Sequence, residues 1–499
     1  MVTTPPSTGA RMGTPAGRWV LLATISGSGM ALLDATVVNI ALPSIAADLG
    51  TDFRTLQWIV NAYTLTLAAL ILLAGALGDH FGRRRIFLLG VVWFAIASLL
   101  CGLAPTAEFL VAARALQGIG GALLTPGSLA IISSTFVATD RAKAVGAWSG
   151  LGGVAAAIGP FAGGWLVALD WRAVFLVNLP VAAFIVVVSL RHVPESLDTQ
   201  SPPGLDVAGA TLAAVGLAGV TYALTSLGEG GSGGGGVIVS SVLGVTALLV
   251  FVLVERRSPH PLVPLGLFAD RSFSVANVVT LLVYAGLGVF FFLLVLQLQI
   301  VAGFSPLVAG SALLPVTVLM LLLSARAGAL AERIGPRLLM TVGPLLAAMG
   351  FLLTLRIGTD ASYLTDVLPA VVVLGLGLSL TVAPLTATVL NSADPRYAGT
   401  ASGVNNAIAR SGGLLAVAVI PVAAGLGGTD YTDPLSFSPG FQTAMLISAA
   451  LLALGALMAL ALLREARPVR ISGVPERLPV ERCSHCGVTG PQLHPANRS

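Results

Sequence analysis

The chain has 499 residues, of which 56% are hydrophobic and 10% are charged, and its net charge is +4. A soluble domain carries about 25% charged residues, so this composition excludes a water-facing globular protein and leaves the lipid bilayer as the solvent. A backbone in lipid must satisfy its own hydrogen bonds, and long apolar runs without alternation select helices over a β-barrel. The sequence therefore predicts an all-α integral membrane protein, whose positive charge marks loop orientation and not a nucleic-acid partner.

Fourteen apolar segments are long enough to cross the bilayer, since one crossing takes about 20 residues. In chain order they are 19–42, 56–77, 86–104, 109–133, 144–167, 173–190, 207–226, 237–254, 273–296, 308–329, 338–355, 367–390, 406–425 and 441–463. The pair 207–226 and 237–254 is the weakest, because a Gly-rich run at 230–236 interrupts it. We interpret that run as a flexible loop between two helices.

The basic residues predict the orientation. With both termini in the cytoplasm, only Arg54, Arg172 and Arg356 fall in outer loops, and Arg114 falls within a span. Every other Lys and Arg is then cytoplasmic, whereas acids outnumber bases in the outer loops. Because cytoplasmic loops of membrane proteins are enriched in Lys and Arg, we expect a multi-pass protein of the plasma membrane with both termini cytoplasmic.

One loop motif occurs twice. Gly75, Leu77, Asp79, Gly82 and Arg84 recur 253 positions later, with Glu in place of Asp. The tenth span is therefore expected to be the second helix of a second bundle. Repeated halves are the usual build of secondary transporters, with the substrate site between them near the bilayer midplane.

This repeat divides the chain into five expected parts. They are an N-terminal tail at 1–17, a six-helix bundle at 18–192, two inserted helices at 193–256, a second six-helix bundle at 257–465 and a C-terminal tail at 466–499. Within the repeated loop we expect a cytoplasmic gate, because its glycines permit close helix approach and its charges can pair with helix ends or lipid headgroups. The alternative is that the arginines only anchor the loop. The expected gating residues are Gly75, Asp79, Gly82, Arg83, Arg84, Glu332 and Arg337.

Asp34 and Arg114 are the two strongly ionisable residues that lie well inside the expected spans. A charge in hydrocarbon is costly unless it is paired or hydrated, so each is a functional candidate. At 1.5 Å per residue, Asp34 lies about 13 Å and Arg114 about 9 Å from the outer ends of their helices, close enough in depth to pair across a central cavity. We interpret them as the proton-coupling pair, the alternative being a static ion pair that only sets packing.

Uncharged polar residues in or near the spans are candidates for the substrate cavity. Gln57 and Asn61 share a helix face, and Gln117 lies one turn from Arg114. Hydrogen bonding between helices is the other explanation for each of them. The expected cavity residues are Asn39, Gln57, Asn61, Gln117 and Gln297.

Four segments together give a resemblance to the major facilitator superfamily, and within it to the fourteen-helix drug:proton antiporters. They are the loop 75–85, the first-helix segment Leu33–Pro43, the fourth-helix segment Arg114–Ala122 and the fifth-helix segment Gly159–Gly164. The segment Trp171–Pro180 is also similar to this branch. The resemblance covers about residues 18–465 and implies the major facilitator fold, with two six-helix bundles plus two inserted helices.

The fifth-helix segment resembles the motif that this family associates with export. It implies that Gly159, Pro160, Gly163 and Gly164 form a kinked helix that packs tightly on the other bundle. Glycine is also merely frequent in membrane helices, which is the competing explanation. The sequence departs from the motif at Ala155, where the family pattern has Gly.

The resemblance implies a proton-coupled exporter of hydrophobic small molecules that works as a monomer without a cofactor. A proton-coupled importer of a nutrient is the alternative, and a sensor without transport stays open. A membrane enzyme is disfavoured because the expected spans contain no His, and the chain has no G-x-x-x-x-G-K-[ST] loop for ATP. Cys483 and Cys486 in the tail supply only half of a zinc site, so we expect no metal.

Overall fold

The computed structural model describes residues 10–197, 206–226, 234–259, 261–393, 397–426 and 433–463. In these ranges the secondary structure is helical, apart from one isolated bridge between Ala10 and Phe136. Cys483 and Cys486 lie outside the described residues. So does most of the Gly-rich run, but its last residues belong to a helix that begins at Gly234. The expected loop is therefore too long there, because glycine is tolerated in membrane helices.

The first bundle contains the helices α1 to α7, with α6 and α7 in line as one crossing. Their bounds are α1 Pro15–Leu49, α2 Phe53–Phe81, α3 Arg83–Gly102, α4 Ala107–Thr135, α5 Ala138–Leu169, α6 Ala173–Leu176 and α7 Asn178–His192. The inserted pair follows as α8 Val207–Ser226 and α9 Gly234–Arg257.

The second bundle contains the helices α10 to α16, in which four crossings include short 3-10, π or α segments. Their bounds are α10 Arg271–Leu296, η2 Gln297–Val301, α11 Pro306–Ser311, α12 Leu314–Ile334, α13 Pro336–Leu353, η3 Thr354–Arg356, η4 Tyr363–Val367, α14 Leu368–Asn391, α15 Ala398–Ala423 and α16 Pro434–Leu462. A separate 3-10 turn, η1 Leu265–Ala269, precedes them. Thirteen described helices are long and apolar enough to cross a membrane, and α5 has the length for one more crossing. The expected all-helical membrane architecture is thus confirmed for the described residues.

Sequence signals explain where many of these helices begin. The side chains of Asp52, Thr106 and Asp270 each accept a hydrogen bond from a backbone N–H of the next helix, which satisfies a donor that the first turn leaves free. The repeated glycines act differently. Gly82 and Gly335 have φ angles of 110° and 85°, a region that side chains with a Cβ rarely adopt, so each makes the sharp connection between two crossings.

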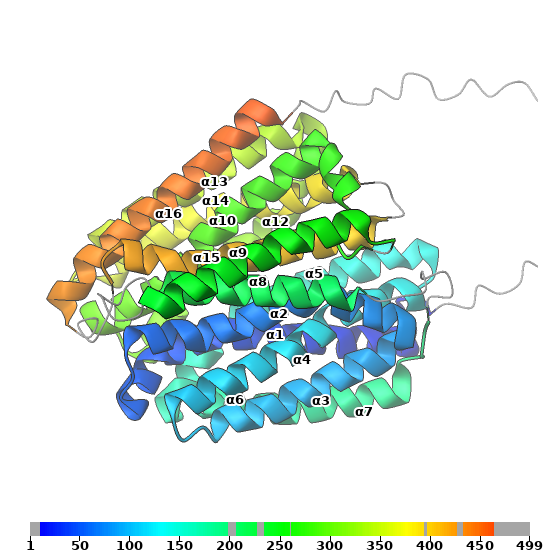
Figure 1. Ribbon diagram of the computed structural model, residues 1–499, viewed down its shortest axis with the longest axis horizontal. Helices are drawn as coiled ribbons and strands as arrows, with labels where there is room; N and C mark the ends of the chain where they lie inside the picture. The colour runs from blue at the N-terminus through cyan, green and yellow to red at the C-terminus, as the bar shows by residue number, and fades with distance from the viewer. Residues whose placement is uncertain are drawn as a thin grey trace, which may run out of the picture.

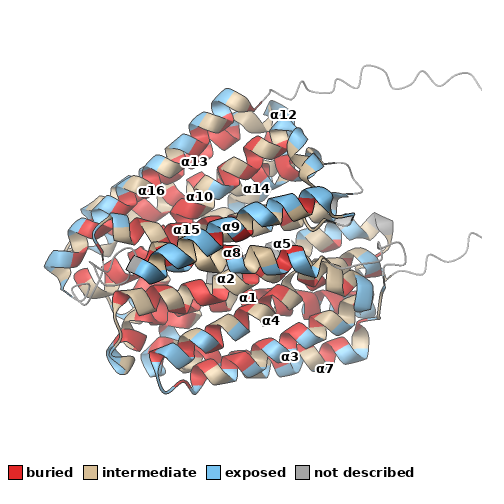
Figure 2. Ribbon diagram, in the orientation of Figure 1, coloured by how far each residue is buried: buried red, intermediate tan, exposed pale blue. Residues whose placement is uncertain are grey.

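Figure 1 shows the two bundles side by side, with α8 and α9 along the seam between them. Helix α8 lies against α2 of the first bundle and α15 of the second. Helix α9 packs chiefly on α8, and most of its surface is exposed, as Figure 2 shows. Such an apolar outer surface is suited to lipid contact.

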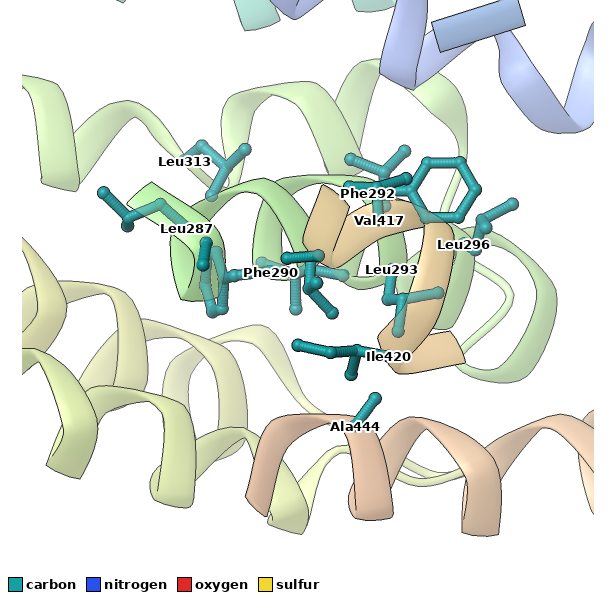
Figure 3. Packing of buried hydrophobic residues seen from close by; sticks show 14 of the residues in the cluster. Leu287, Phe290, Phe292, Leu293, Leu296, Leu313, Val417, Ile420 and Ala444 are labelled. Carbon is teal, nitrogen blue, oxygen red and sulfur yellow. The ribbon is translucent and has the colours of Figure 1, made fainter. Parts of the chain in front are cut away.

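The bundles are closed together at one end, which we call the α1–α2 end after the loop between Leu49 and Phe53. A continuous apolar cluster there joins α1 and α2 to α10, α11 and α15. Figure 3 shows its second-bundle part around α10, with Val417 and Ile420 of α15 reaching in. The rings of Phe53 and Phe292 meet edge to face at 5.6 Å across the seam. A second cluster, toward the opposite α2–α3 end, lies almost wholly within the first bundle.

Candidate functional site

Asp34 of α1 and Arg114 of α4 form an ion pair inside the first bundle. Arg114 Nη1 lies 2.5 Å from Asp34 Oδ2, and the two residues are 2% and 1% exposed. The guanidinium also donates from Nε to the carbonyl of Ile59 on α2 at 3.1 Å. Its Cζ lies 4.3 Å from the ring centroid of Tyr63, also on α2, which adds a cation–π contact. One charged pair therefore ties three helices together.

Amide side chains complete the hydrogen bonding of the Asp34 carboxylate. Gln117 Nε2 donates to Asp34 Oδ1 at 2.7 Å, and Asn178 Nδ2 of α7 donates to the same oxygen at 3.1 Å. Both amides also donate to Ser98 Oγ of α3, at 2.9 Å and 3.2 Å. Gln117 Oε1 accepts from Arg114 at 2.6 Å. The network spans α1, α2, α3, α4 and α7.

The structure brings Asp34, Arg114 and Gln117 together, but within one bundle and not across a space between the bundles. A carboxylate that accepts several hydrogen bonds and faces a guanidinium is stabilised in its charged form, whereas burial alone would favour the protonated form. Because the pair is buried, a proton that reaches Asp34 must break hydrogen bonds of this network. Sequence reasoning missed Ser98 and Tyr63, whose neutral side chains give no signal in an apolar span.

Two long amides bridge the bundles at the α1–α2 end. Gln57 Nε2 donates to the Val417 carbonyl of α15 at 2.7 Å, and Gln299 Nε2 donates to the Ile40 carbonyl of α1 at 3.0 Å. Each bond joins a side chain of one bundle to the backbone of the other. They close this end together with the apolar cluster.

The other expected cavity residues have different surroundings. Gln297 donates to the Ile357 carbonyl at 2.7 Å, within the second bundle. Asn61 is 1% exposed, and neither polar atom of its side chain has a hydrogen-bond partner among the described residues. The Oδ1 atom of Asn39 is in the same situation. Buried polar atoms without a partner are rare in folded proteins and mark places where a ligand or water completes the bonding.

The first copy of the repeated loop is bound to the segment after α7. Asp79 pairs with Arg83 at 2.7 Å. Glu195 Oε1 accepts from the Arg84 backbone N–H at 3.0 Å, and its other oxygen lies within 3.7 Å of Arg84 and 3.6 Å of Arg85. Glycine is favoured at position 82 by its φ angle of 110°, and a Cβ there would also lie 2.8 Å from the carboxylate end of Glu195. Sequence reasoning missed Glu195, which is far from the loop in sequence.

The second copy is held differently. Arg337 Nε donates to the Leu460 carbonyl of α16 at 2.7 Å, whereas Glu332 is exposed. Gly75 and Gly328 have matching environments, because a Cβ on either would make only ordinary contact, at 3.8 Å, with Pro126 or Ala383. The close helix approach expected at Gly75 is therefore not required by its neighbours.

The glycines of α5 contact two different helices, α1 and α11. Gly159 and Gly163 face Thr36 and Val37 of α1, in the same bundle. Only Gly164 faces the other bundle, where a Cβ would lie 2.6 Å from the Pro306 carbonyl oxygen. The expectation that all of them pack on the other bundle is thus wrong, because neighbouring positions such as 163 and 164 point about 100° apart on a helix.

A further charged residue lies within a span. Arg410 was expected on the cytoplasmic side, because it lies only four residues after the start of the expected span 406–425. Helix α15 begins at Ala398, which places Arg410 about 18 Å along it at 1.5 Å per residue. Asp34 and Arg114 are therefore not the only ionisable residues deep in the helices.

Comparisons with known proteins agree with this architecture. The model of the Major Facilitator Superfamily matches residues 24–417. The puromycin resistance protein pur8 of Streptomyces alboniger is 40% identical over 410 residues, which is 81% of this chain and 80% of that protein. The multidrug efflux pump LfrA of Mycolicibacterium smegmatis is 34% identical over 411 residues, 82% and 81% of the two chains.

Solved structures share the fold at low sequence identity. A POT family transporter in complex with a thioalcohol-conjugated peptide has a TM-score of 0.67 at 17% identity and covers 91% of this chain and 97% of its own. A bacterial homologue of the human lysosomal transporter Spinster, inward-facing and occupied, has a TM-score of 0.64 at 17% identity, covering 90% and 97%.

Proposed function

The chain belongs to the major facilitator superfamily, and we propose that it is a proton-coupled exporter of hydrophobic small molecules. Its relatives include proteins named for puromycin resistance and multidrug efflux. We place it in a bacterial plasma membrane as a monomer with cytoplasmic termini, in line with its basic loops. The α1–α2 end is then the outer end. The protein is a multi-pass membrane transporter and not an enzyme.

The observation that carries the proposal is the Asp34–Arg114 ion pair. Asp34 is a buried carboxylate that can take up a proton, and Arg114 is the charge that responds. Protonation of Asp34 removes the anionic partner of a guanidinium that is 1% exposed. An unpaired buried charge costs several kcal/mol, so the proton makes this arrangement unfavourable and favours another one.

Helix α1 offers a short path from this network to the seam between the bundles. Thr36 and Val37, which follow Asp34 on α1, pack on Gly159 and Gly163 of α5. Ile40 accepts the hydrogen bond of Gln299 from the second bundle. A shift of α1 when Asp34 changes charge therefore acts on the closed end within two helical turns.

The closed α1–α2 end is compatible with export by alternating access. With cytoplasmic termini this end faces the outside, and an exporter needs closure on that side while it takes up substrate from the cell. Return of a proton through Asp34 would accompany release outside. The competing importer would use the same parts in the opposite order, so the direction of substrate movement decides between them.

A drug-susceptibility panel in an efflux-deficient bacterial host tests the proposal. Cells with the wild-type protein should tolerate several-fold more of at least one hydrophobic drug, and cells with Asp34→Asn at equal membrane expression should not. Greater sensitivity with the wild type would indicate import. Equal resistance from both variants would contradict proton coupling through Asp34.

A further inference from the structure

Arg410 lies at mid-depth on α15. It is about 18 Å from Ala398 and about 20 Å from Ala423 along the helix axis, at 1.5 Å per residue. Its side chain is partly exposed. No acid among the described residues forms an ion pair with it, and Asp34 is already bound by Arg114, Gln117 and Asn178. A guanidinium at this depth of the membrane costs free energy when no anion pairs with it. Binding of an anionic group beside Arg410 is therefore favoured.

The face of α15 that carries Arg410 is turned toward the first bundle. Gly403, Ala407, Arg410 and Val417 follow the spacing of one helical face. A Cβ on Gly403 would lie 2.8 Å from Leu72 of α2. Ala407 packs against the second apolar cluster, which lies almost wholly within the first bundle. The Val417 carbonyl accepts from Gln57 of α2. Arg410 is therefore directed at the seam between α2 and α15.

Contacts on either side of Arg410 along α15 define which residues of α2 lie opposite it. Helices α2 and α15 are antiparallel here, with Gln57 at Val417 and Leu72 at Gly403. This register places Arg410 opposite Thr64 and about one helical turn from Asn61. Asn61 is 1% exposed with both polar atoms of its side chain free among the described residues. An unpaired amide and an unpaired guanidinium thus share one stretch of the seam.

Aromatic residues lie on the two helices that flank Arg410. Tyr63 of α2 directly precedes Thr64, which the register places opposite Arg410. A Cβ on Gly413, three residues after Arg410, would lie 3.5 Å from the carbonyl oxygen of Tyr284 on α10. Tyr284 also packs against the apolar cluster that joins the two bundles. A ligand held at Arg410 would have aromatic and aliphatic groups on both sides and one strong positive charge, while the Asp34–Arg114 pair nearby has no net charge.

We propose that Arg410 and Asn61 form the polar part of the substrate site, and that this part binds a carboxylate or similar anionic group carried on an apolar aromatic body. The proposal rests on the proposed transport function and names its substrate class. A guanidinium offers a carboxylate two parallel N–H donors, and the Asn61 amide can add another. A cationic group would be repelled by Arg410, and among the described residues no acid forms an ion pair with Arg410 that could bind it instead.

Three pyrene probes test this with the purified full-length protein in phosphatidylcholine nanodiscs at neutral pH. Pyrenebutyrate is anionic, its methyl ester is neutral and pyrenebutylamine is cationic, on the same aromatic body. Binding is measured by energy transfer from protein tryptophan, with empty nanodiscs subtracted. The wild type should bind the acid about ten-fold more tightly than the ester, as expected for one charge-assisted pair, and the amine most weakly.

Arg410→Gln should weaken the acid about ten-fold and leave the ester unchanged, and Arg410→Lys should retain part of the preference. Asn61→Ala should weaken the acid by less. Arg257→Gln is the matched control, since Arg257 is an exposed arginine at the end of α9 and not at mid-depth. Unchanged ester binding shows that Arg410→Gln is folded.

The proposal is overturned if the wild type does not prefer the acid, whether it binds all three probes equally or none. It is also overturned if Arg410→Gln weakens all probes alike while Arg410→Lys behaves as wild type, or if Arg257→Gln has the same effect as Arg410→Gln. These measurements use no proton gradient. A failure of proton-coupled export therefore leaves the binding preference intact, and loss of the preference leaves export to be judged on its own test.

Discussion

At the scale of single residues, the pairing of Asp34 with Arg114 has consequences for stability as well as for transport. Both oxygens of Asp34 are occupied, by Arg114 on one side and by Gln117 and Asn178 on the other. Removing one partner of a buried pair leaves the other charge uncompensated, which costs about 3–5 kcal/mol. Removing both charges avoids that penalty.

A double-mutant cycle tests this coupling. Arg114→Gln should lower the melting temperature more than the double variant Asp34→Asn with Arg114→Gln, because the second change removes the unpaired carboxylate. Arg114→Lys should keep part of the transport activity, since it keeps the charge but loses the fork that reaches Ile59. Additive losses in the cycle would show that the two charges act independently.

The gate loop gives a second prediction at this scale. Glu195 holds Arg84 and Arg85 and covers Gly82, whereas Glu332 in the second copy is exposed. Glu195→Gln should reduce the transport rate up to about five-fold, the equivalent of about 1 kcal/mol for a partly screened ion pair. Glu332→Gln is the control and should be close to wild type. Equal rates in proteoliposomes for both variants would mean that the loop only anchors the chain.

At the scale of elements, the contact between α5 and α11 sets how closely the bundles approach. Gly164 lies against the Pro306 carbonyl, and a Cβ on Gly310 would press on the Pro160 carbonyl. Backbone meets backbone at both points, and backbone cannot move aside as a flexible side chain can. The small residues therefore determine the closed state of the α1–α2 end.

Gly164→Ala should open that end. The added methyl group would lie 2.7 Å from Leu307 Cα, so α5 and α11 must separate. A cysteine at Val301, buried in the closed seam, should then react faster with a membrane-impermeant thiol reagent added from outside. Gly146→Ala on the same helix is the control, because a Cβ there meets nothing within 4 Å. Unchanged labelling in Gly164→Ala would place the closure elsewhere.

At the scale of the whole molecule, the two bundles contribute different charged residues. The first holds the titratable network of Asp34, and the second contributes Arg410 at the seam. They are joined at the α1–α2 end by Gln57, Gln299 and the apolar cluster. Arg114 contacts Ile59 and Tyr63 on α2, the helix that also carries Asn61. The proton site and the proposed substrate site can therefore communicate through α2 and the seam, in line with the alternating-access build of repeated transporters.

Much of this arrangement could be predicted from the sequence, for physical reasons. Apolar run length fixes the crossings, and the cost of burying charge makes Asp34 and Arg114 conspicuous. Residue partners could not be predicted, because depth and helix rotation depend on packing. Arg410 was misplaced since α15 begins eight residues before its expected span. Glu195 and Gly164 depend on which helix comes to lie beside them, which a single chain's pattern does not encode.

The most direct test of the account is the release of protons when substrate binds. Purified protein in weakly buffered detergent solution is mixed with a transported drug, and the pH change is recorded. If drug and proton exchange at Asp34, the wild type should release protons when the drug binds, whereas Asp34→Asn should bind the drug without releasing any. Equal proton release from both proteins would contradict the assignment of Asp34 as the coupling site.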